Sequence, residues 1–182
     1  MEPVFSLEDE YTGEKIGSKL ERVREVMKEN GCNAHVLSSL DDIAWLLNIR
    51  GNDIAYCPLV LSYAIVYNNL VELFADIRKF SDDIINLLAE NQVKIYPYED
   101  IYRKVSEMTS EDKLLLDSAI MNYSLYQAIS KETVIVDKQN PEILMKSVKN
   151  ETQAENLRKA HLKDAVAHTK FMYWLKKNIG RV

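Results

Sequence analysis

The sequence predicts an α/β fold, with a mixed β-sheet flanked by helices and a long helix after it. Short apolar runs alternate along the chain with segments of about ten residues that have helical spacing, which is the pattern of α/β proteins. Two of the apolar runs, 59–67 and 70–75, are separated only by Asn68-Asn69. Because consecutive Asn residues can adopt the positive φ angles of a tight hairpin turn, this part of the sheet is expected to be antiparallel.

The beginning of the chain predicts an entry segment, a helix and a strand. Residues 1–13 have no clear periodicity and are expected to form an irregular linker. Apolar residues at every third or fourth position predict a helix over 14–30, and Gly31 fits its C-terminal stop. A short strand follows over 34–37. Ser39 is then expected to cap another short helix.

The next segment predicts a turn and the two strands of the hairpin. Gly and Asn at the centre of residues 50–53 tolerate positive φ, so a turn is expected there. The run over 59–67 has almost no polar residue, as expected of a central strand covered on both faces. In the run over 70–75, Glu72 and Phe74 alternate with smaller apolar residues. We therefore expect one face of that second strand to be exposed.

Strands and helices continue to alternate up to residue 140. Ser81 fits the N-cap of a helix with two Asp residues in its first turn. The polar break before Pro141 predicts a domain boundary, so residues 1–140 are interpreted as one domain whose entry linker is 1–13. The elements expected in its second half are helices over 81–91, 99–108 and 118–129 and strands over 93–96, 113–116 and 133–136.

Residues 141–182 are interpreted as a linker and one long helix. The helix is expected to run from Asn150, in a variant capping box, to about residue 178. Its apolar residues recur at steps of three and four and make a stripe that includes Leu157, Phe171 and Leu175. A stripe of this length needs a partner surface. We expect part of it to face something absent from the chain, and these three residues to drive self-association.

Composition restricts the classes of partner. The 182 residues carry a net charge of −5, but residues 141–182 hold nine Lys or Arg against four Asp or Glu. The acidic remainder argues against nucleic acid as a partner. Acids within the basic segment favour a solvated helix face over a nucleic-acid or membrane helix. No uncharged apolar run approaches the length of a bilayer span, so we expect a cytoplasmic protein with no membrane partner.

Candidate site residues are few. Arg50 and Asp53 flank a Gly in the predicted turn, where they either line a binding surface or pair locally and hold the shape of the loop. His161, Asp164 and His168 follow one helix face, but the two His are seven residues apart, a rise of roughly 10 Å. That separation is too great for both to bind one ion without ligands between them. We therefore assign no catalytic, metal-binding or cofactor-binding residue in this chain.

Several stretches of the sequence resemble one known family. Residues 41–53 read DDIAWLLNIRGND and are followed by Pro58 and Ser62-Tyr63. Tyr11-Thr12-Gly13-Glu14 lies before this motif, and MKSVKNE over 145–151 and RKAHLKDA over 158–165 lie after it. Together they resemble the middle domain of the three-domain X-Pro aminopeptidases (aminopeptidase P) of the creatinase and prolidase superfamily. The resemblance extends from about Tyr11 to Leu175.

This resemblance implies a creatinase N-terminal-like fold for residues 1–140 and a metallopeptidase as the whole protein. Such enzymes are hydrolases that cleave the bond between an N-terminal residue and proline, with two divalent metals, commonly manganese. Two Asp, one His and two Glu of a C-terminal domain hold the metals. That domain would begin near Asn150 and continue past Val182, so none of the five ligands matches a position here.

We therefore expect a truncated, non-catalytic fragment, made of the α/β domain and the first helix of a missing catalytic domain. Its expected roles are scaffolding, control of access to the metal site and subunit contacts. The expected partners are the missing domain and, as a further arrangement, a second copy in a homodimer. Arg50 and Asp53 are the expected interdomain contacts. The alternative is a stand-alone binding or dimerisation module with the same fold.

Overall fold

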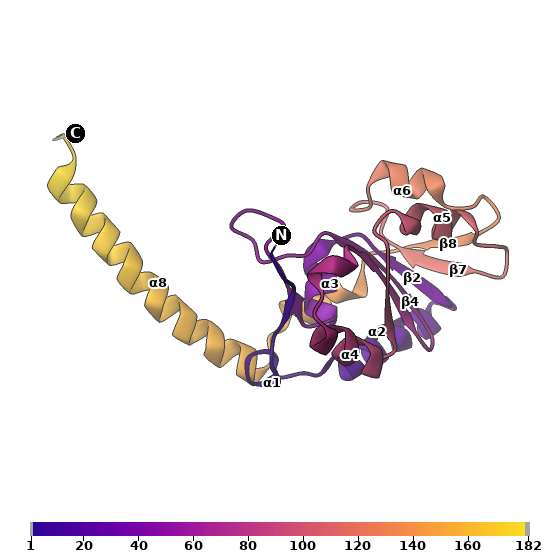
Figure 1. Ribbon diagram of the computed structural model, residues 1–182, viewed down its shortest axis with the longest axis horizontal. Helices are drawn as coiled ribbons and strands as arrows, with labels where there is room; N and C mark the ends of the chain where they lie inside the picture. The colour runs from indigo at the N-terminus through magenta and orange to yellow at the C-terminus, as the bar shows by residue number, and fades with distance from the viewer. Residues whose placement is uncertain (1, 181–182) are drawn as a thin grey trace.

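Six strands form one sheet in the order β6-β5-β4-β2-β7-β8, and helices cover both of its faces (Figure 1). The computed structural model describes residues 2–180. The mixed α/β architecture that the sequence predicts is confirmed. In chain order the strands of this sheet are β2 (Ala34–Leu37), β4 (Ser62–Tyr67), β5 (Val71–Ala75), β6 (Val93–Tyr96), β7 (Lys113–Leu116) and β8 (Val134–Asp137).

The hairpin makes the sheet mixed. Strand β4 is antiparallel to both of its neighbours, β2 and β5, whereas the pairs β5–β6, β2–β7 and β7–β8 are parallel. The hairpin closes where the Tyr67 N–H donates to the Leu70 carbonyl at 2.9 Å. The prediction of positive φ angles at Asn68 and Asn69 is wrong, because neither residue is among those with positive φ in the described chain.

Each face of the sheet has its own apolar cluster. On one face, side chains of α2 (Ile16–Glu29), α3 (Leu40–Leu46) and α4 (Asp82–Glu90) pack against β2, β4 and β5. On the other face, α5 (Asp100–Ser106) and α6 (Tyr123–Ala128) cover the same strands and β7. Burying each large aliphatic or aromatic side chain contributes about 1.5–3 kcal/mol. The two-sided burial explains why the strands read as nearly continuous apolar runs.

The prediction that one face of the second hairpin strand is exposed is wrong. All five residues of β5 are buried, because β5 lies between β4 and β6 and is covered on both faces. Leu73 belongs to one apolar cluster and Phe74 to the other. The buried Glu72 is compensated by the Lys104 ammonium, whose Nζ donates to its carboxylate at 2.9 Å.

The entry segment is ordered rather than irregular. Strand β1 (Phe5–Ser6) pairs antiparallel with β3 (Ile49–Arg50) in a separate two-stranded sheet, and α1 (Asp9–Thr12) follows. The Leu7 N–H donates to the Asn48 carbonyl at 2.8 Å, and Val4 is buried. This short pairing joins segments far apart in sequence, so periodicity within residues 1–13 could not reveal it.

Several element boundaries differ from the expected ones for local reasons. The predicted cap at Ser39 is wrong, because its hydroxyl donates to the Asp41 carboxylate at 2.8 Å and accepts no helix N–H. Helix α6 begins only after Asn122, whose side chain accepts from the Leu125 N–H. By contrast, Ser81 caps α4 as expected. Residues 59–61 precede β4 and bond to the preceding loop instead.

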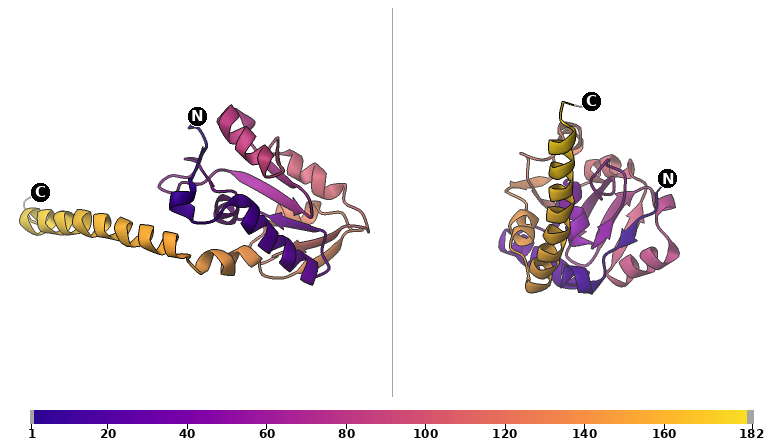
Figure 2. Two further views of the ribbon diagram at one scale, coloured as in Figure 1. Left: turned by 90° about the horizontal axis from the view of Figure 1, so that it is seen from below. Right: turned by 90° about the vertical axis from the view of Figure 1, so that its left-hand side faces the viewer.

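Two helices follow the sheet, a short α7 (Pro141–Ser147) and the long α8 (Glu151–Asn178). The expected capping box of α8 is confirmed, since Asn150 accepts from the Gln153 N–H and Gln153 accepts in return. Helix α8 leaves the domain and projects away from it (Figure 2). Its base is attached to α1, because Asn150 Nδ2 donates to the Thr12 carbonyl and Asn156 Nδ2 donates to the Glu10 carbonyl, each at 2.9 Å.

Gly13 is the close contact on which the base of α8 depends. It has φ +64°, and a Cβ there would lie 2.7 Å from both Asn150 Oδ1 and Thr152 Cβ. Gly31 has a similar φ of +66° but nothing within 4 Å of such a Cβ. Both glycines therefore have a left-handed backbone, but only at Gly13 would a side chain collide with the cap of α8.

We predict that Gly13→Ala lowers the free energy of unfolding by about 2–3 kcal/mol, from the left-handed backbone and a disturbed helix cap. Gly31→Ala, the matched control, should lower it by about 1–2 kcal/mol, from the backbone alone. Urea unfolding of both variants measures the difference. Equal losses would show that the contact with Asn150 is unimportant.

Candidate functional site

Arg50 and Asp53, the expected interdomain contacts, both make bonds to nearby parts of the domain. The Arg50 guanidinium donates from one nitrogen, Nη1, to the carbonyls of Ala44 at 2.6 Å and Ile49 at 2.8 Å. Asp53 pairs with Lys79 at 2.5 Å and accepts from the Leu61 N–H at 2.8 Å. Arg50 thus joins the end of α3 to β3, whereas Asp53 fixes the β3–β4 loop. Their contact with another domain remains a prediction.

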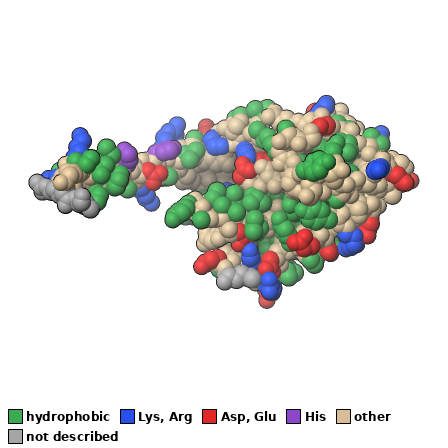
Figure 3. Space-filling view, turned by 90° about the horizontal axis from the view of Figure 1, so that it is seen from above, with side chains coloured by type: hydrophobic (Ala, Val, Ile, Leu, Met, Phe, Trp, Pro, Cys, Tyr) green, Lys and Arg blue, Asp and Glu red, His purple; other side chains and the backbone are tan. Residues whose placement is uncertain are grey.

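Arg50 also lines a pocket where α8 leaves the domain. The pocket has a volume of about 330 Å³ and lies among α1, the start of α8, and the end of α3. In the space-filling view, α8 and the body of the domain meet at a narrow waist (Figure 3). The residues that line the pocket are Leu7, Tyr11, Thr12, Lys19, Trp45, Asn48, Arg50, Lys149, Gln153, Asn156 and Leu157.

Lys19 is the unusual member of this pocket, because it is only 1% exposed. Its Nζ donates to the Trp45 carbonyl at 2.7 Å and to Asn48 Oδ1 at 2.5 Å, and it lies 4.8 Å from the centre of the Trp45 ring. Burial lowers the pKa of Lys19 to about 8, partly offset by the more distant Glu14. Lys19 lies within the helix predicted over 14–30, where the helical spacing gives no sign that its side chain is buried.

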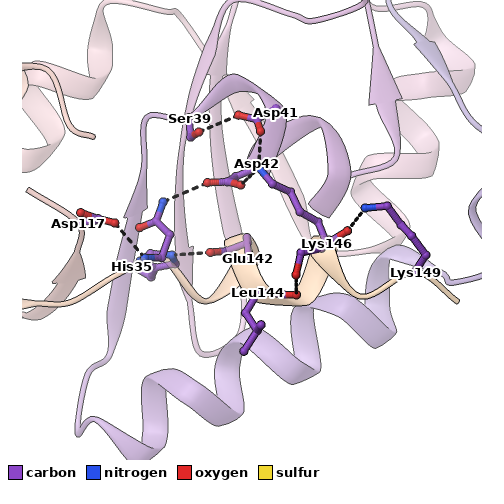
Figure 4. A network of polar contacts seen from close by, with 11 residues as sticks. His35, Ser39, Asp41, Asp42, Asp117, Glu142, Leu144, Lys146 and Lys149 are labelled. Carbon is purple, nitrogen blue, oxygen red and sulfur yellow. Dashed lines mark hydrogen bonds and ion pairs between the residues drawn. The ribbon is translucent and has the colours of Figure 1, made fainter. Parts of the chain in front are cut away.

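A second polar site is fully buried between the sheet and α7. His35 on β2 and Glu142 in the first turn of α7 are both inaccessible, and Nε2 of the imidazole lies 3.2 Å from a Glu142 carboxylate oxygen. The other ring nitrogen, Nδ1, lies 3.0 Å from the Leu115 carbonyl on β7. The pair therefore joins α7 to β2 and β7, and Figure 4 shows the contact between His35 and Glu142.

Further contacts extend this network to α3. The buried Asp42 carboxylate accepts from Asn140 Nδ2 at 3.2 Å and pairs with Lys146 Nζ at 2.5 Å. Lys146 also pairs with Asp41 (Figure 4). The Asn140 N–H donates to Asp117 at 3.3 Å. Both ends of α7 are thus fastened to the domain, which fixes the direction in which the chain continues into α8.

The surroundings of His35 favour its charged form. Burial by itself lowers the pKa of His35, but the Glu142 carboxylate, its hydrogen bond and the Leu115 carbonyl outweigh that effect and raise the pKa above its ordinary value. Both ring nitrogens face acceptors, so the imidazolium suits this geometry. The pair is a structural contact and not a catalytic site, because both side chains are inaccessible to solvent and to any substrate.

The side chains of α8 are unusual for a surface helix. In the expected stripe, Leu157 and Phe171 are 42% and 54% exposed and Leu175 is half-buried. At 100° per residue, three further apolar side chains lie on the opposite side of the helix, and all are exposed. These are Leu162, Val166 and Tyr173. A helix that is apolar on opposing sides is typical of a buried position, which the single predicted stripe did not indicate.

Two kinds of site find no support in the described residues. Within 2–180, no group of three or more His, Cys, Asp and Glu is placed to hold a metal ion. In the same range, none of the helices combines the length and apolar character that a membrane span requires.

We predict that Glu142→Gln flattens the pH dependence of stability. A His with a raised folded pKa stabilises fully below its unfolded pKa of about 6.5, and this contribution is lost as pH rises through the folded pKa. The amide introduced by the substitution can donate to a neutral His35, so the variant should fold, with about 1–2 kcal/mol lost at pH 6 and less at higher pH.

Urea unfolding of wild type and variant from pH 6 to pH 9 measures this difference. Lys19 titrates with the opposite sign, because its pKa is lowered to about 8, but it is present in both proteins and cancels. A difference that stays constant with pH would contradict the assignment of a charged His35.

Sequence comparisons agree with the fold and with the resemblance. Residues 1–153 match the family model described as Creatinase/Prolidase N-terminal domain. The chain is 36% identical over 176 residues to Xaa-Pro aminopeptidase 1 of Dictyostelium discoideum, a match that covers 97% of this chain and 28% of that protein. It is 33% identical over 188 residues to Xaa-Pro aminopeptidase 2 of Mus musculus, covering 99% and 28%. The chain therefore spans less than a third of these relatives.

Structural comparisons give the same result. X-prolyl aminopeptidase from Caenorhabditis elegans, described as a cytosolic enzyme with a di-nuclear active site, matches with a TM-score of 0.86 at 32% identity. That match covers 97% of this chain and 30% of the enzyme. Xaa-Pro dipeptidase from Bacillus anthracis shares the fold, with a TM-score of 0.60 at 15% identity over 87% of this chain and 44% of that one. The chain belongs to the creatinase/prolidase N-terminal domain family.

Proposed function

We propose that this chain is the non-catalytic part of an Xaa-Pro aminopeptidase-like metallopeptidase, with α8 as the first helix of its catalytic domain. The observation that carries the proposal is α8 itself. Its apolar residues lie on opposing sides and are exposed, although such a helix is stable in water only when other protein encloses it. The relatives are about three times longer than this chain, so they contain residues that could enclose it.

The proposed reaction is hydrolysis of the bond between an N-terminal residue and proline. Two divalent metals, with manganese proposed, would activate water and polarise the carbonyl from a domain outside these residues. In that protein the present chain would hold the first catalytic helix in place, through the buried network around α7. This role would explain why α7 is fastened at both ends while α8 has no buried residue.

We further propose that the β3–β4 loop takes part in access to the metal site. The loop lies at the end of the domain from which α8 projects (Figures 1 and 2). It presents Tyr56, fully exposed and with φ +64°, beside the exposed Ile54 and Leu61. Asp53 and Lys79 fix its base. A cytoplasmic location is proposed by analogy with the relative from C. elegans.

The proposal is tested by activity measurements on two polypeptides. We predict that the 182-residue chain with Mn²⁺ does not cleave an Xaa-Pro peptide. A longer polypeptide that also carries the proposed catalytic domain should cleave it, and a chelator should abolish that activity. Chelator-sensitive turnover by the 182-residue chain alone would place the active site within these residues and contradict the proposal.

A second candidate function is a dimerisation module, favoured by the same exposed apolar side chains of α8. We predict that the chain self-associates in concentrated solution, and that Phe171→Glu weakens this association at least tenfold. Thr169→Glu is the matched control, because it adds the same charge to an exposed position on the same helix and should have a much smaller effect. Sedimentation equilibrium measures both. A wild-type chain that stays monomeric at high concentration would contradict self-association.

A further inference from the structure

The pocket at the base of α8 contains two cations that have no anionic partner among residues 2–180. Lys19 and Arg50 both line it, and neither forms an ion pair within the described chain. Both side chains donate their hydrogen bonds to uncharged oxygens, those of backbone carbonyls and of the Asn48 side-chain amide. Lys149 also lines the pocket, and Asp and Glu are absent from its described lining residues.

The carboxylate with the strongest influence on Lys19 is engaged elsewhere. This carboxylate is Glu14, which is held by Arg22 at 2.9 Å and by the Ser18 hydroxyl at 2.9 Å. Buried charged groups in proteins are normally paired, since an unpaired one loses its hydration without replacement. A Lys that is 1% exposed with only neutral partners is therefore an exception that a ligand would explain.

Donors remain for such a ligand. An ammonium group has three N–H donors, and two on Lys19 are used. Both hydrogen bonds of Arg50 come from a single nitrogen, which leaves Nε and Nη2 without a hydrogen bond to residues 2–180. A guanidinium edge of two N–H groups matches the two oxygens of a carboxylate.

We propose that this pocket binds a carboxylate, held by Arg50 and by the ammonium of Lys19. Its volume of about 330 Å³ lies within the range of small-ligand sites. Leu7, Trp45 and Leu157 form apolar walls, so the carboxylate would carry a short aliphatic group. The chemistry admits two sources, a terminal α-carboxylate or the side chain of an Asp or Glu. The inference goes beyond the proposed function and does not depend on it.

Binding should be linked to the proton on Lys19. The pKa of Lys19 is lowered to about 8 by burial, and a carboxylate alongside it favours the charged form. Saturation with the ligand should therefore raise the pKa of Lys19. Conversely, affinity should fall as pH rises through about 8, because the ammonium loses its charge.

The test is an NMR titration of the 182-residue chain at pH 7 with three probes. Acetate carries the carboxylate alone, N-acetyl-leucine presents an α-carboxylate, and N-acetyl-glutamate α-amide presents a Glu side chain. We expect saturable shifts at residues around the pocket, tighter binding of one of the two larger probes, and a higher pKa of the Lys19 ammonium when saturated. The tighter probe identifies the source.

Variants make the assignment specific. Arg50→Gln and Lys19→Met should each weaken binding at least tenfold, whereas Lys28→Met, which removes the same charge from the same helix outside the pocket, should leave it unchanged. Far-UV circular dichroism confirms folding, and Arg50→Gln serves alone if Lys19→Met does not fold. Linear shifts without saturation for all three probes, or equal affinity in Arg50→Gln, would overturn the proposal.

Discussion

The buried contact between His35 and Glu142 fixes where α7 lies on the sheet, and with it the point from which the long helix starts. It joins residues 107 positions apart and fixes α7 against β2 and β7. A buried pair of this kind is weak evidence for added stability, since both groups lose their hydration. Its partners determine which side of α7 faces the sheet. Together with the contacts of Asn140 and of Lys146 with Asp42, it sets the direction in which the chain continues after α7. Helix α8 therefore leaves the domain at a fixed place, beside α1.

The contrast between α7 and α8 links structure to function. Helix α7 is tied to the sheet and to α3 by charged groups at both of its ends. Helix α8 is tied only at its base, by Asn150 and Asn156, and none of its described residues is buried. A helix that is attached only at its base and exposes its apolar side chains is the arrangement expected of a chain that positions further protein. The chain belongs to the creatinase/prolidase N-terminal domain family, and the positioning of further protein remains a proposal.

Local patterns in the sequence predicted those parts of the fold that depend on neighbouring residues. The capping box at Asn150 and the cap at Ser81 follow from short-range chemistry. The hairpin partners β4 and β5 were also predicted correctly, although the positive φ angles expected in the turn between them are absent. The burial of β5 could not be predicted, because it depends on β6 lying along its other edge. The pairing of β1 with β3 was missed for a similar reason, since two residues per strand give no periodic signal.

The candidate sites were harder to predict than the fold. Arg50 was singled out because it follows the helix motif and precedes Gly51, but Lys19 lies on a helix where a Lys is ordinary. Only the tertiary structure shows that α1, α3 and α8 enclose it. His35 and Glu142 each look unremarkable in sequence, and their contact across the sheet gave no local signal.

Amide hydrogen exchange along the 182-residue chain measures whether α7 is fixed to the sheet and α8 lacks a partner. If the network fixes α7 and leaves α8 without a partner, the amides of α7 should be protected nearly as well as those of β2 and β4. Protection should then fall steeply along α8 beyond Asn156, measured at a concentration where the chain is monomeric. Exchange in α7 as fast as in the far end of α8, or an α8 protected as strongly as the sheet, would contradict the account.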